Sequence, residues 1–421
     1  MNKIYSFFSF RKMKKIFYLL IISLLITACH YKPLKDKDEL KIVITSDIHY
    51  FLKEYYKDCE WFEESILNSD GKMVTYCDEI VDAFIKEIEK IEPDLVILTG
   101  DLSFYGEKGS HEELAQKFLS LKNKGIDVAV IPGNHDIDSI YAKAYGQDDF
   151  IKLENINAQT FKQIYKDLGY HIAYHQHNQS LSYSIQLNQD YTLLMMDSTA
   201  HQLTGSDFDV GGYFTESTMA WLENELELVK NDGKRPIVAM HHNLAVHNDL
   251  LNQGYTIKNN EIIAQLFKKY NVPFVLSGHI HCQNIKKING IYDIASSSLL
   301  NAPLQYGTMT LNKESMKYQT QCLQISQDAN QYFDLVSSNK FTKDFAVIKD
   351  KNVREKMKEV IVKANRYYFT GNITDHIDEL KNMEGYSYYN KEEGQQLLFY
   401  KKYLESMMKE KNNNQSLNFI Y

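Results

Sequence analysis

The stretch Val128-Ala-Val-Ile-Pro-Gly-Asn134-His135-Asp136 decides the fold class of this chain. In it a short aliphatic run ends in Pro and Gly, and polar side chains that can bind metals follow at once. Such a run is typical of a strand that is buried on both faces of a sheet. Side chains just past the carboxyl end of such a strand line the crevice of an open α/β sheet. The stretch therefore predicts an α/β domain with a functional rim at its strand ends.

Four other runs repeat this pattern, and each ends in Asp or His side chains. They are Ile42-Val-Ile-Thr-Ser-Asp47-Ile-His49, Leu95-Val-Ile-Leu-Thr-Gly-Asp101, Ile237-Val-Ala-Met-His241-His242 and Phe274-Val-Leu-Ser-Gly-His279-Ile-His281. One such run alone is weak evidence. Five of them predict five strands that deliver Asp, His and Asn to one rim.

Segments with helical periodicity lie between these runs. Apolar residues recur on one face of Asp78 to Glu92, and Pro93 ends that segment. The other expected helices are Ser110 (as N-cap) to Leu121, Thr215 to Lys230 and Glu261 to Tyr270. Strands and helices in alternation imply a mainly parallel sheet with helices on its faces.

Later segments have the pattern of antiparallel hairpins. The expected pairs are Ser182 to Gln186 with Thr192 to Met196, and Gly307 to Leu311 with Tyr318 to Leu323. We therefore expect an α/β fold in which a two-layer β-sandwich is flanked by helices. Residues 141–179 are polar and lack a strong period, so we expect an insertion beside the site that contributes to substrate selectivity.

From about residue 341 the pattern becomes helical. The expected helices are Val353 to Tyr368, one that begins at Asp375 with Thr374 as its cap, and Glu392 to Met408. They carry aromatic stripes but no ligand cluster, so we expect them to pack on the catalytic domain. A chain of 421 residues exceeds the size at which single cores stop growing. We expect a catalytic domain at 41–335 and a smaller, mainly helical C-terminal domain at 341–421.

The first 28 residues have the order of a secretory signal, with basic side chains, an apolar stretch from Ile16 to Ile26 and then Thr27-Ala28-Cys29. This apolar stretch of eleven residues is too short for a bilayer, which takes about 20, and this weighs against an uncleaved anchor helix. The ending resembles a bacterial lipobox, which implies removal of 1–28 and lipidation of Cys29. We expect residues 29–40 to be a linker and the protein to be anchored by lipid on the extracytoplasmic face of the cell membrane.

The net charge limits the possible partners, and the cysteine content limits the possible disulfides. Residues 1–28 carry five positive and no negative charges, so their removal takes the formal net charge from −8 to −13. Nucleic-acid binding needs clustered Lys and Arg, so we expect no nucleic-acid polymer as a partner. Outside the membrane a disulfide between Cys59 and Cys77 is chemically allowed. Four unpaired buried thiols, with Cys282 and Cys322, are the alternative.

The rim offers carboxylate, amide and imidazole ligands. They are Asp47, His49, Asp101, Asn134, His241 or His242, His279 and His281. This mixture suits Mn, Fe or Zn better than Mg or Ca alone. Seven ligands are too many for one tetrahedral ion but suffice for two divalent or mixed-valence ions with a bridging carboxylate. Two metals about 3.5–4 Å apart can clamp the oxygens of a displacement at phosphorus, and their net positive charge attracts a small phosphate ester.

The motifs, taken in order, resemble the calcineurin-like metallophosphoesterase superfamily. They are Asp47-x-His49, Gly100-Asp101, Gly133-Asn134-His135-Asp136, a strand-end His and Gly278-His279-x-His281. Residues 100–111 more narrowly resemble the cyclic-nucleotide phosphodiesterase-like lipoproteins, some of which carry a helical C-terminal domain. Phe104 and Tyr105 depart from that branch, because a polar pair is more usual there.

The resemblance implies a role for each motif residue. One metal would be held by Asp47, His49, Asp101 and His281, and the other by Asp101, Asn134, His241 and His279. Asp101 would bridge the two. His135 would face the substrate as general acid or charge stabiliser, and Asp136 would orient its imidazole.

The remaining histidines call for separate interpretations. Strand alternation points His241 and His242 opposite ways, so only one should bind metal. The resemblance favours His241, which stands where the family has its strand-end ligand. The polar surroundings of His175 and His177 predict surface residues. We interpret His111 as a capping or surface group. His247 is either a phosphate contact or an ordinary loop residue. The aromatic residues Phe104, Tyr105 and Tyr213 are weak candidates for stacking on a nucleobase.

These features predict a metal-dependent phosphodiesterase in which a metal-bound hydroxide attacks phosphorus and His135 assists the leaving oxygen. The choice of diesters, with 3′,5′-cyclic nucleotides among them, is what the narrower resemblance of residues 100–111 implies. A phosphomonoesterase or nucleotidase on the same fold is one alternative, and a non-catalytic metal-binding lipoprotein is another. His135 favours an enzyme, because holding the metals does not require it.

Overall fold

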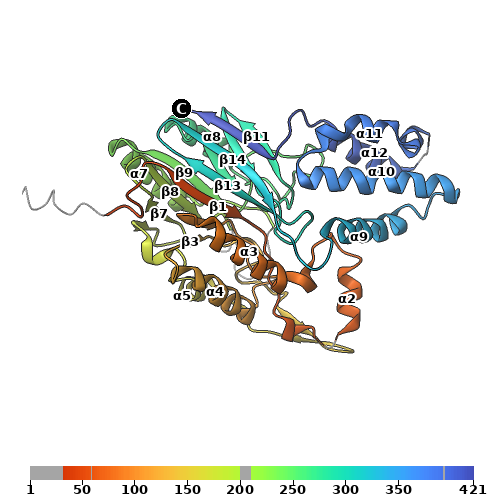
Figure 1. Ribbon diagram of the computed structural model, residues 1–421, viewed down its shortest axis with the longest axis horizontal. Coiled ribbons are helices and arrows are strands. Elements are labelled where there is room, and N and C mark those ends of the chain that lie inside the picture. Colours follow the sequence, from red (N-terminus) through yellow and green to blue (C-terminus); the bar gives the residue numbers. More distant parts are fainter. Residues whose placement is uncertain (1–31, 58, 200–209, 392–393) are drawn as a thin grey trace, which may run out of the picture.

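A computed structural model describes residues 32–57, 59–199, 210–391 and 394–421. The expected signal segment and Cys29 lie outside these residues. Two β-sheets pack face to face, and helices cover their outer faces (Figure 1). The predicted α/β sandwich with flanking helices is confirmed. Within the described part of the chain, no helix combines the length and the apolar character that a membrane crossing requires.

The first sheet carries three of the ligand-bearing strands. Its members are β1 (Leu40–Thr45), β2 (Leu95–Leu98), β3 (Asp127–Val130), β13 (Gln305–Leu311), β14 (Ser315–Cys322) and β15 (Ser416–Ile420). Their order across the sheet is β15-β14-β13-β1-β2-β3. Strands β1, β2 and β3 are parallel, so their carboxyl ends share one edge, while β13, β14 and β15 join by antiparallel pairing.

The second sheet carries the other two ligand-bearing strands. Its members are β6 (His175–Gln176), β7 (Tyr183–Gln186), β8 (Tyr191–Met196), β9 (Arg235–Met240), β10 (Phe274–Ser277), β11 (Asn284–Ile288) and β12 (Ile291–Ala295). Their order is β11-β12-β10-β9-β8-β7-β6, with β8, β9, β10 and β12 parallel. The predicted hairpins β7–β8 and β13–β14 are both present as antiparallel pairs.

The alternation of strand β8 shows why both faces of the second sheet are apolar. Leu193 and Met195 belong to the large core that the two sheets share, whereas Leu194 and Met196 pack in a separate cluster on the outer face. Successive strand residues point to opposite faces, so a strand covered on both sides needs an unbroken apolar run. The same reason explains the other aliphatic runs of the sequence.

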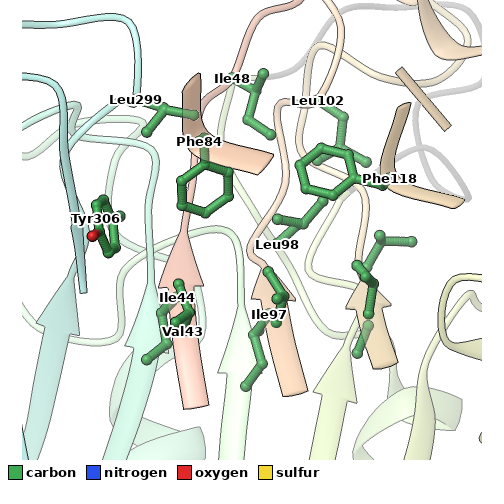
Figure 2. Close-up of a cluster of buried hydrophobic side chains, with 14 of the residues drawn as sticks. Val43, Ile44, Ile48, Phe84, Ile97, Leu98, Leu102, Phe118, Leu299 and Tyr306 are labelled. Carbon is green, nitrogen blue, oxygen red and sulfur yellow. The ribbon is translucent and has the colours of Figure 1, made fainter. Parts of the chain in front are cut away.

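Helices cover both outer faces. They are α3 (Cys77–Ile91) and α4 (Lys108–Lys122) on the first sheet, and α7 (Glu216–Asn231) and α8 (Asn260–Lys269) on the second. Helix α5 (Ala158–Ile164) packs on α4, and α2 (Glu60–Ile66) packs near the 3₁₀ turn at Val74–Tyr76. Two further 3₁₀ turns lie at Lys53–Tyr55 and Tyr170–Ile172. Phe84 of α3 and Phe118 of α4 pack over Ile44 and Leu98 of the first sheet (Figure 2). Leu222 and Leu226 of α7 pack on the second.

The expected capping role of Ser110 was wrong. Helix α4 starts three residues earlier than expected, with Glu107 at the N-cap position. Ser110 lies inside the first turn, and its Oγ accepts a hydrogen bond from the backbone N–H of Leu52 at 3.2 Å. The Ser110 hydroxyl thus hydrogen-bonds a residue that is distant in sequence, instead of capping the helix as the local pattern predicted. In contrast, Thr215 caps α7 as an N-cap residue, because its hydroxyl accepts from the N–H of Thr218.

The C-terminal region has its own core but is not purely helical. Its elements are α9 (Ala329–Asp344), α10 (Lys351–Thr370), a 3₁₀ turn (Ile373–His376), α11 (Ile377–Asn382), a 3₁₀ segment (Glu384–Asn390) and α12 (Gln395–Met407). They pack around Phe341, Phe345 and Ile361. The last strand, β15, then returns to the edge of β14 in the first sheet. The expectation of a helical segment to residue 421 missed this strand, because an edge strand of five residues gives little periodic signal.

Two further local expectations changed. Thr374 does not cap α11, since residues 373–376 form a 3₁₀ turn and His376 occupies the N-cap position. The polar region 141–179 does contain structure, namely the two-stranded sheet of β4 (Lys143–Tyr145) and β5 (Phe150–Lys152), helix α5 and strand β6. The Cys59–Cys77 disulfide does not form. Both thiols are free and buried, as is Cys282, whereas the free Cys322 is exposed rather than buried as expected.

Candidate metal centre and active site

Five strand ends meet at one rim and turn sharply there. The ligand residues with left-handed backbone are Asp47 (φ 51°), His49 (φ 41°), Asp101 (φ 51°), His279 (φ 71°) and His281 (φ 58°). Such a conformation costs a non-glycine residue about 1–3 kcal/mol and persists only where its surroundings impose it. Here the loops hold one another, because the N–H groups of Asp47 and His49 donate to the carbonyls of Gly100 and Asp101 at 3.0 and 2.9 Å. The rest of the fold thus stabilises a strained rim.

One group of ligand atoms comes from the ends of β1, β2 and β10. It consists of Asp47, His49, Asp101 and His281, whose donor atoms all lie within 4.8 Å of one another. Nε2 of His49 lies 3.1 Å from Nε2 of His281, and the latter lies 3.3 Å from Oδ1 of Asp47. Three of the four side chains are buried, and His281 is partly exposed. The set is the one that the sequence resemblance implied for the first metal.

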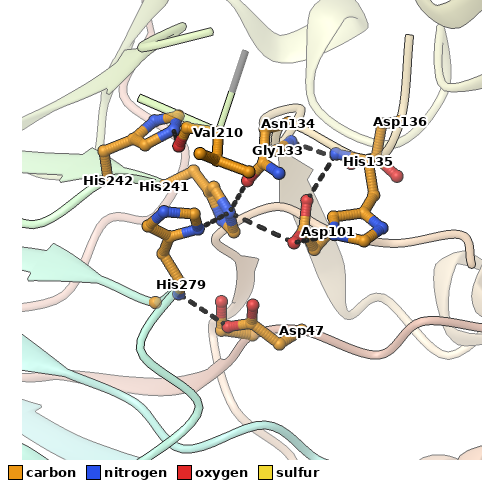
Figure 3. Close-up of polar contacts among 12 residues, drawn as sticks. Asp47, Asp101, Gly133, Asn134, His135, Asp136, Val210, His241, His242 and His279 are labelled. Atoms are coloured by element: carbon orange, nitrogen blue, oxygen red, sulfur yellow. Dashed lines mark hydrogen bonds and ion pairs between the residues drawn. The ribbon is translucent and has the colours of Figure 1, made fainter. Parts of the chain in front are cut away.

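A second group comes from the ends of β2, β9 and β10. Asp101, His241 and His279 again place their donor atoms within 4.8 Å of one another, and all three are buried. Oδ1 of Asn134 joins them at 3.1 Å from Nε2 of His241 (Figure 3). This is the set that the resemblance implied for the second metal.

Asp101 stands between the two groups. Its Oδ2 atom lies 3.7 Å from Nε2 of His49 in the first group and 3.4 Å from Nε2 of His241 in the second. Its other oxygen, Oδ1, accepts a hydrogen bond from the backbone N–H of His135 at 2.9 Å. That bond holds the carboxylate so that one oxygen faces both groups. In this position Asp101 could serve as a ligand in both groups.

The hydrogen-bond pattern shows that these groups fit cations. Nδ1 of His241 donates to the carbonyl of Thr99 at 2.8 Å, and Nε2 of His279 donates to the carbonyl of Gly254 at 3.0 Å. A carbonyl can only accept, so in neutral rings the two inner nitrogens carry lone pairs. Those nitrogens lie 3.1 Å apart, which requires a proton or a metal ion between them. Histidine ligands in metal sites are oriented in this way, through an outer N–H bonded to an acceptor.

The first group carries a comparable sign. Oδ2 of Asp47 accepts from the backbone N–H of His279 at 2.9 Å. Its Oδ1 atom is buried and accepts no hydrogen bond. A buried carboxylate oxygen without a donor is costly unless a cation lies beside it. Charge from the neighbouring histidines lowers the pKa of Asp47 despite the opposing effect of burial, so the carboxylate is available as a ligand.

The choice between His241 and His242 is clear in the structure. His241 points its Nε2 at Asp101, Asn134 and His279, whereas His242 points away toward Val210 (Figure 3). The ring of His242 pairs through Nδ1 with the Ser198 hydroxyl at 2.8 Å and donates from Nε2 to the Val210 carbonyl at 3.0 Å. The favoured residue, His241, is the one that faces the ligand cluster. His242 instead contacts Ser198 and Val210 on the other side of the strand end.

His135 lies beside the ligands without belonging to either group. Its side chain is 16% exposed, its Nε2 lies 3.9 Å from Oδ2 of Asp101, and its ring packs edge-on against His49. Tyr105 stacks on its other side with ring centroids 4.9 Å apart. Burial lowers the pKa of His135, partly against the charge of Asp101. The ring therefore faces the rim from a fixed position.

The expected role of Asp136 was wrong. Nδ1 of His135 donates to the backbone carbonyl of Phe104 at 2.7 Å, so a carbonyl and not Asp136 fixes this side of the ring. The carboxylate of Asp136 instead accepts from the backbone N–H groups of Leu102, Ser103 and Gly133. Burial, followed by the charge of Asp101, raises its pKa to about 7. Asp136 thus ties together the loops after β2 and β3 on which Asp101 and Asn134 stand.

Several other histidine expectations need correction. His177 is buried, and its ring contacts the hydroxyls of Ser180 and Ser217, so it is not a surface residue. His175 is 39% exposed in its side chain and pairs with Glu225, which agrees with a surface position. His111 is fully buried, and its nitrogens lie 2.8 Å from the Tyr165 hydroxyl and 3.0 Å from the Asp136 carbonyl. His247 is buried against Asn284 and Asp293, which weighs against the interpretation as a phosphate contact.

The sequence patterns missed two residues beside the ligands. Oδ2 of Asp70 lies 3.9 Å from Nδ1 of His281. The ring of Tyr255 lies 5.3 Å from that of His279, and Tyr255 is 39% exposed. Both belong to loops without an apolar run, so no periodic signal marks them. Phe104 is buried rather than presented for stacking, while Tyr105 packs on His135.

Comparison of the sequence with known protein families identifies the family of this chain. The model of the family described as "Calcineurin-like phosphoesterase" matches residues 40–283, which is more than half of the chain. The chain belongs to the calcineurin-like phosphoesterase family. This phosphoesterase is accordingly a metal-dependent hydrolase of phosphoric esters. The match includes all the strands that carry the ligand groups.

Two relatives of this phosphoesterase bear more specific names. A 3′,5′-cyclic-nucleotide phosphodiesterase of Nostoc sp. is 24% identical over 236 residues, which is 55% of this chain and 73% of the relative. A probable cyclic nucleotide phosphodiesterase of Xenorhabdus bovienii is 23% identical over 246 residues, 58% of this chain and 80% of the relative. Among solved structures, a dimetal phosphatase from Danio rerio covers 67% of this chain and 96% of its own, with 13% identity and a TM-score of 0.47.

Proposed function

We propose that this phosphoesterase hydrolyses phosphate diesters, with 3′,5′-cyclic nucleotides as the substrate class, using two Mn, Fe or Zn ions. The observation that carries the two-metal proposal is the position of Asp101, whose Oδ2 atom lies 3.7 Å from His49 and 3.4 Å from His241. The choice of diesters rests on the similarity to the two relatives, which are named as cyclic-nucleotide phosphodiesterases. The donor set of carboxylate, amide and imidazole supports the choice of metals.

The proposed metals and His135 would have different roles in the reaction. Two bound ions would polarise the phosphate and activate a water for attack at phosphorus. His135 reaches the same space with Nε2, because Nδ1 is engaged by the Phe104 carbonyl. That carbonyl only accepts, so Nδ1 keeps its proton and Nε2 can donate to a leaving oxygen only when the ring is doubly protonated. A bound anionic phosphate favours that second protonation, which is the condition for a general acid.

The substrate class can be tested on the detergent-solubilised full-length protein loaded with Mn²⁺. Turnover is compared for a bis-aryl phosphate, a mono-aryl phosphate and 3′,5′-cyclic nucleotides. We expect the diester and the cyclic nucleotides to be hydrolysed with the higher kcat/KM. Activity confined to the monoester would contradict the proposal and favour a phosphomonoesterase or nucleotidase.

Two carboxylate variants serve as matched controls for this assay. Asp101→Asn removes the shared ligand and is expected to abolish turnover of every substrate. Asp82→Asn changes a carboxylate that is 48% exposed on helix α3 and is expected to leave all rates unchanged. Equal activity in both variants would point to a contaminating or non-specific activity. Metal binding without turnover of any ester would favour the non-catalytic alternative.

We infer that the enzyme works outside the membrane, anchored through lipidated Cys29. The inference rests on the order of basic, apolar and small residues before this cysteine. In cells fed a labelled fatty acid, the wild-type protein is expected to carry the label and to sediment with membranes. Cys29→Ala is expected to lose the label. Equal labelling of both proteins, or labelling of neither, would contradict the inference.

A further inference from the structure

The loop before helix α3 buries a lysine beside the metal rim. Lys72 is only 8% exposed, although lysine is rarely buried without a reason. Its ammonium lies 3.1 Å from Oδ2 of Asp70, and Asp70 is its single ion-pair partner within the described part of the chain. Asp70 itself is half exposed. An ammonium has three N–H donors, so this pairing leaves donors for another acceptor.

Asp70 joins this lysine to the first ligand group. The same carboxylate oxygen that pairs with Lys72 lies 3.9 Å from Nδ1 of His281. The ammonium and the imidazole therefore share one neighbour. Lys72 is placed at the His281 side of the rim, where the ligand group is most open to solvent.

Backbone contacts fix the loop to the ligand-bearing segments. The N–H of Met73 donates to the carbonyl of Leu300 at 2.9 Å. Two residues earlier in that segment, the Ser298 hydroxyl donates to the carbonyl of Asp47 at 2.8 Å. A short chain of hydrogen bonds thus connects the backbone around Lys72 with a metal ligand. The position of the lysine is built into the site.

The C-terminal region packs against the same loop. Gly71 has φ +93°, and a Cβ atom on it would lie 2.7 Å from the ring of Phe333 in helix α9. Only glycine fits this conformation and this contact. Helix α9 therefore packs directly on the residue between Asp70 and Lys72. This contact gives the C-terminal region a role in shaping the rim.

The charge of Lys72 contributes to the pKa shifts of three residues in or beside the first ligand group. Burial lowers the pKa of His49 well below its usual value, and the Lys72 charge is the next cause. The same charge acts on His135 and Tyr105, where burial is the larger cause. Lys72 stays protonated, because pairing with Asp70 raises its pKa although burial opposes this. Lys72 therefore adds a positive charge near His49, His135 and Tyr105.

We propose that Lys72 is a substrate-binding residue whose ammonium donates to a non-bridging oxygen of the ester phosphate, while Asp70 and the Gly71–Phe333 contact hold it in place. This role rests on the proposed function, since it assumes that a phosphate ester occupies the rim. A lysine supplies a point charge suited to phosphate oxygens. The substrate would thus be held by a protein cation in addition to the two metals.

Inorganic phosphate is a probe that does not depend on the type of ester. Its Kd is measured by calorimetry on the Mn²⁺-loaded full-length protein and on Lys72→Gln, Lys72→Arg and Lys90→Met, the last being a 72% exposed lysine of α3. Loss of a hydrogen bond to a charged group predicts about 10- to 100-fold weaker phosphate binding in Lys72→Gln. We expect Lys72→Arg to recover part of this affinity and Lys90→Met to show none of the loss. KM for the esters is expected to rise in parallel.

Metal content separates the proposed role from a merely structural one. Lys72→Gln is expected to retain both metals, as measured by elemental analysis. Unchanged phosphate affinity with both metals present would overturn the proposal, and so would loss of the metals in this variant. If the wild type hydrolyses only monoesters, the diester proposal fails while the phosphate measurements still judge Lys72.

A measurement on the wild type avoids any folding defect of the variants. Amine acetylation is followed by mass spectrometry on the Mn²⁺-loaded protein with and without inorganic phosphate. Lys72 is expected to be labelled several-fold more slowly when phosphate is present, while the labelling of Lys90 does not change. Labelling of Lys72 that is readily measured without phosphate and proceeds at the same rate with phosphate would refute its contact with phosphate.

Discussion

Nε2 of His241 lies 3.1 Å from Nδ1 of His279, although the other nitrogen of each ring already donates to a backbone carbonyl. Without a metal, a proton must lie between the two facing nitrogens. The charge of Asp101 and its hydrogen bond raise the pKa of His241 to about 9, although burial alone would lower it. Proton and metal therefore compete for one position.

Metal binding is expected to release about one proton from this pair near neutral pH. Mn²⁺ is titrated into metal-free protein in two buffers that differ in ionisation enthalpy, and the difference in heat reports the protons released. Because His241 is protonated below about pH 9 in the metal-free protein, metal affinity is expected to fall as pH is lowered. Identical heats in both buffers would contradict this competition.

His241→Ala and His242→Ala are expected to differ sharply although the residues are neighbours. His241→Ala removes a ligand and is expected to weaken metal binding at the second group by about 100-fold or more, beyond the effect of losing a supporting residue. His242→Ala leaves Ser198 and Val210 without their partner and is expected to lower the free energy of unfolding by about 1–3 kcal/mol while both metals remain. Elemental analysis and thermal melting distinguish the two. Metal loss in His242→Ala alone would reverse the assignment.

His135→Ala is expected to retain both metals and to lose turnover by about 10²-fold or more, because the ring faces the rim without being a ligand. The measurement combines kcat with metal content. His175→Ala, which changes a surface histidine paired with Glu225, is the control. Unchanged kcat in His135→Ala would remove this residue from the reaction.

Gly133→Ala is expected to abolish metal binding through a steric effect. A Cβ atom at this position would lie 2.2 Å from Oδ1 and 2.3 Å from the backbone nitrogen of Asp101. The bridging carboxylate must therefore move. Gly125→Ala is the control, since a Cβ there meets no atom within 4 Å and only the positive φ is strained, at about 1 kcal/mol. Wild-type metal content in Gly133→Ala would show that the loop can shift without harm.

Glu107 is expected to make the folded state less stable as pH rises. Burial raises its pKa to about 8 from the usual 4.5; Oε2 accepts from the N–H of Tyr105, and the buried Oε1 has no partner. At pH values between these two pKa values, the folded protein holds a proton that the unfolded chain releases. The contribution of Glu107 to the free energy of unfolding therefore falls by about 1.4 kcal/mol per pH unit.

The variant Glu107→Gln stays neutral and is expected to gain stability relative to the wild type as pH increases from 5 to 8. Urea unfolding at several pH values measures this difference. The exposed Glu112→Gln in the same helix controls for the change in net charge. A constant difference between Glu107→Gln and the wild type across this range would show that Glu107 is ionised in the folded protein.

Local patterns predicted much of the fold because each depends on a few neighbouring residues. The runs that became β1, β2, β3, β9 and β10 carry their own evidence of burial on both faces. Patterns failed where a distant partner decided the outcome. Ser110 hydrogen-bonds Leu52 instead of capping a helix, and strand β15 exists because β14 offers it an edge.

The sequence by itself determined which residue types stand at the five strand ends, and therefore that Asp, His and Asn form a metal-binding rim. Only the tertiary structure decided which nitrogen of each histidine faces inward, that Asp101 lies between two ligand groups, that Phe104 rather than Asp136 holds His135, and that Lys72 joins the rim. Asp47 and His279, which share a hydrogen bond, are 232 positions apart. Contacts over such separations arise from the packing of whole sheets, and no local period records them.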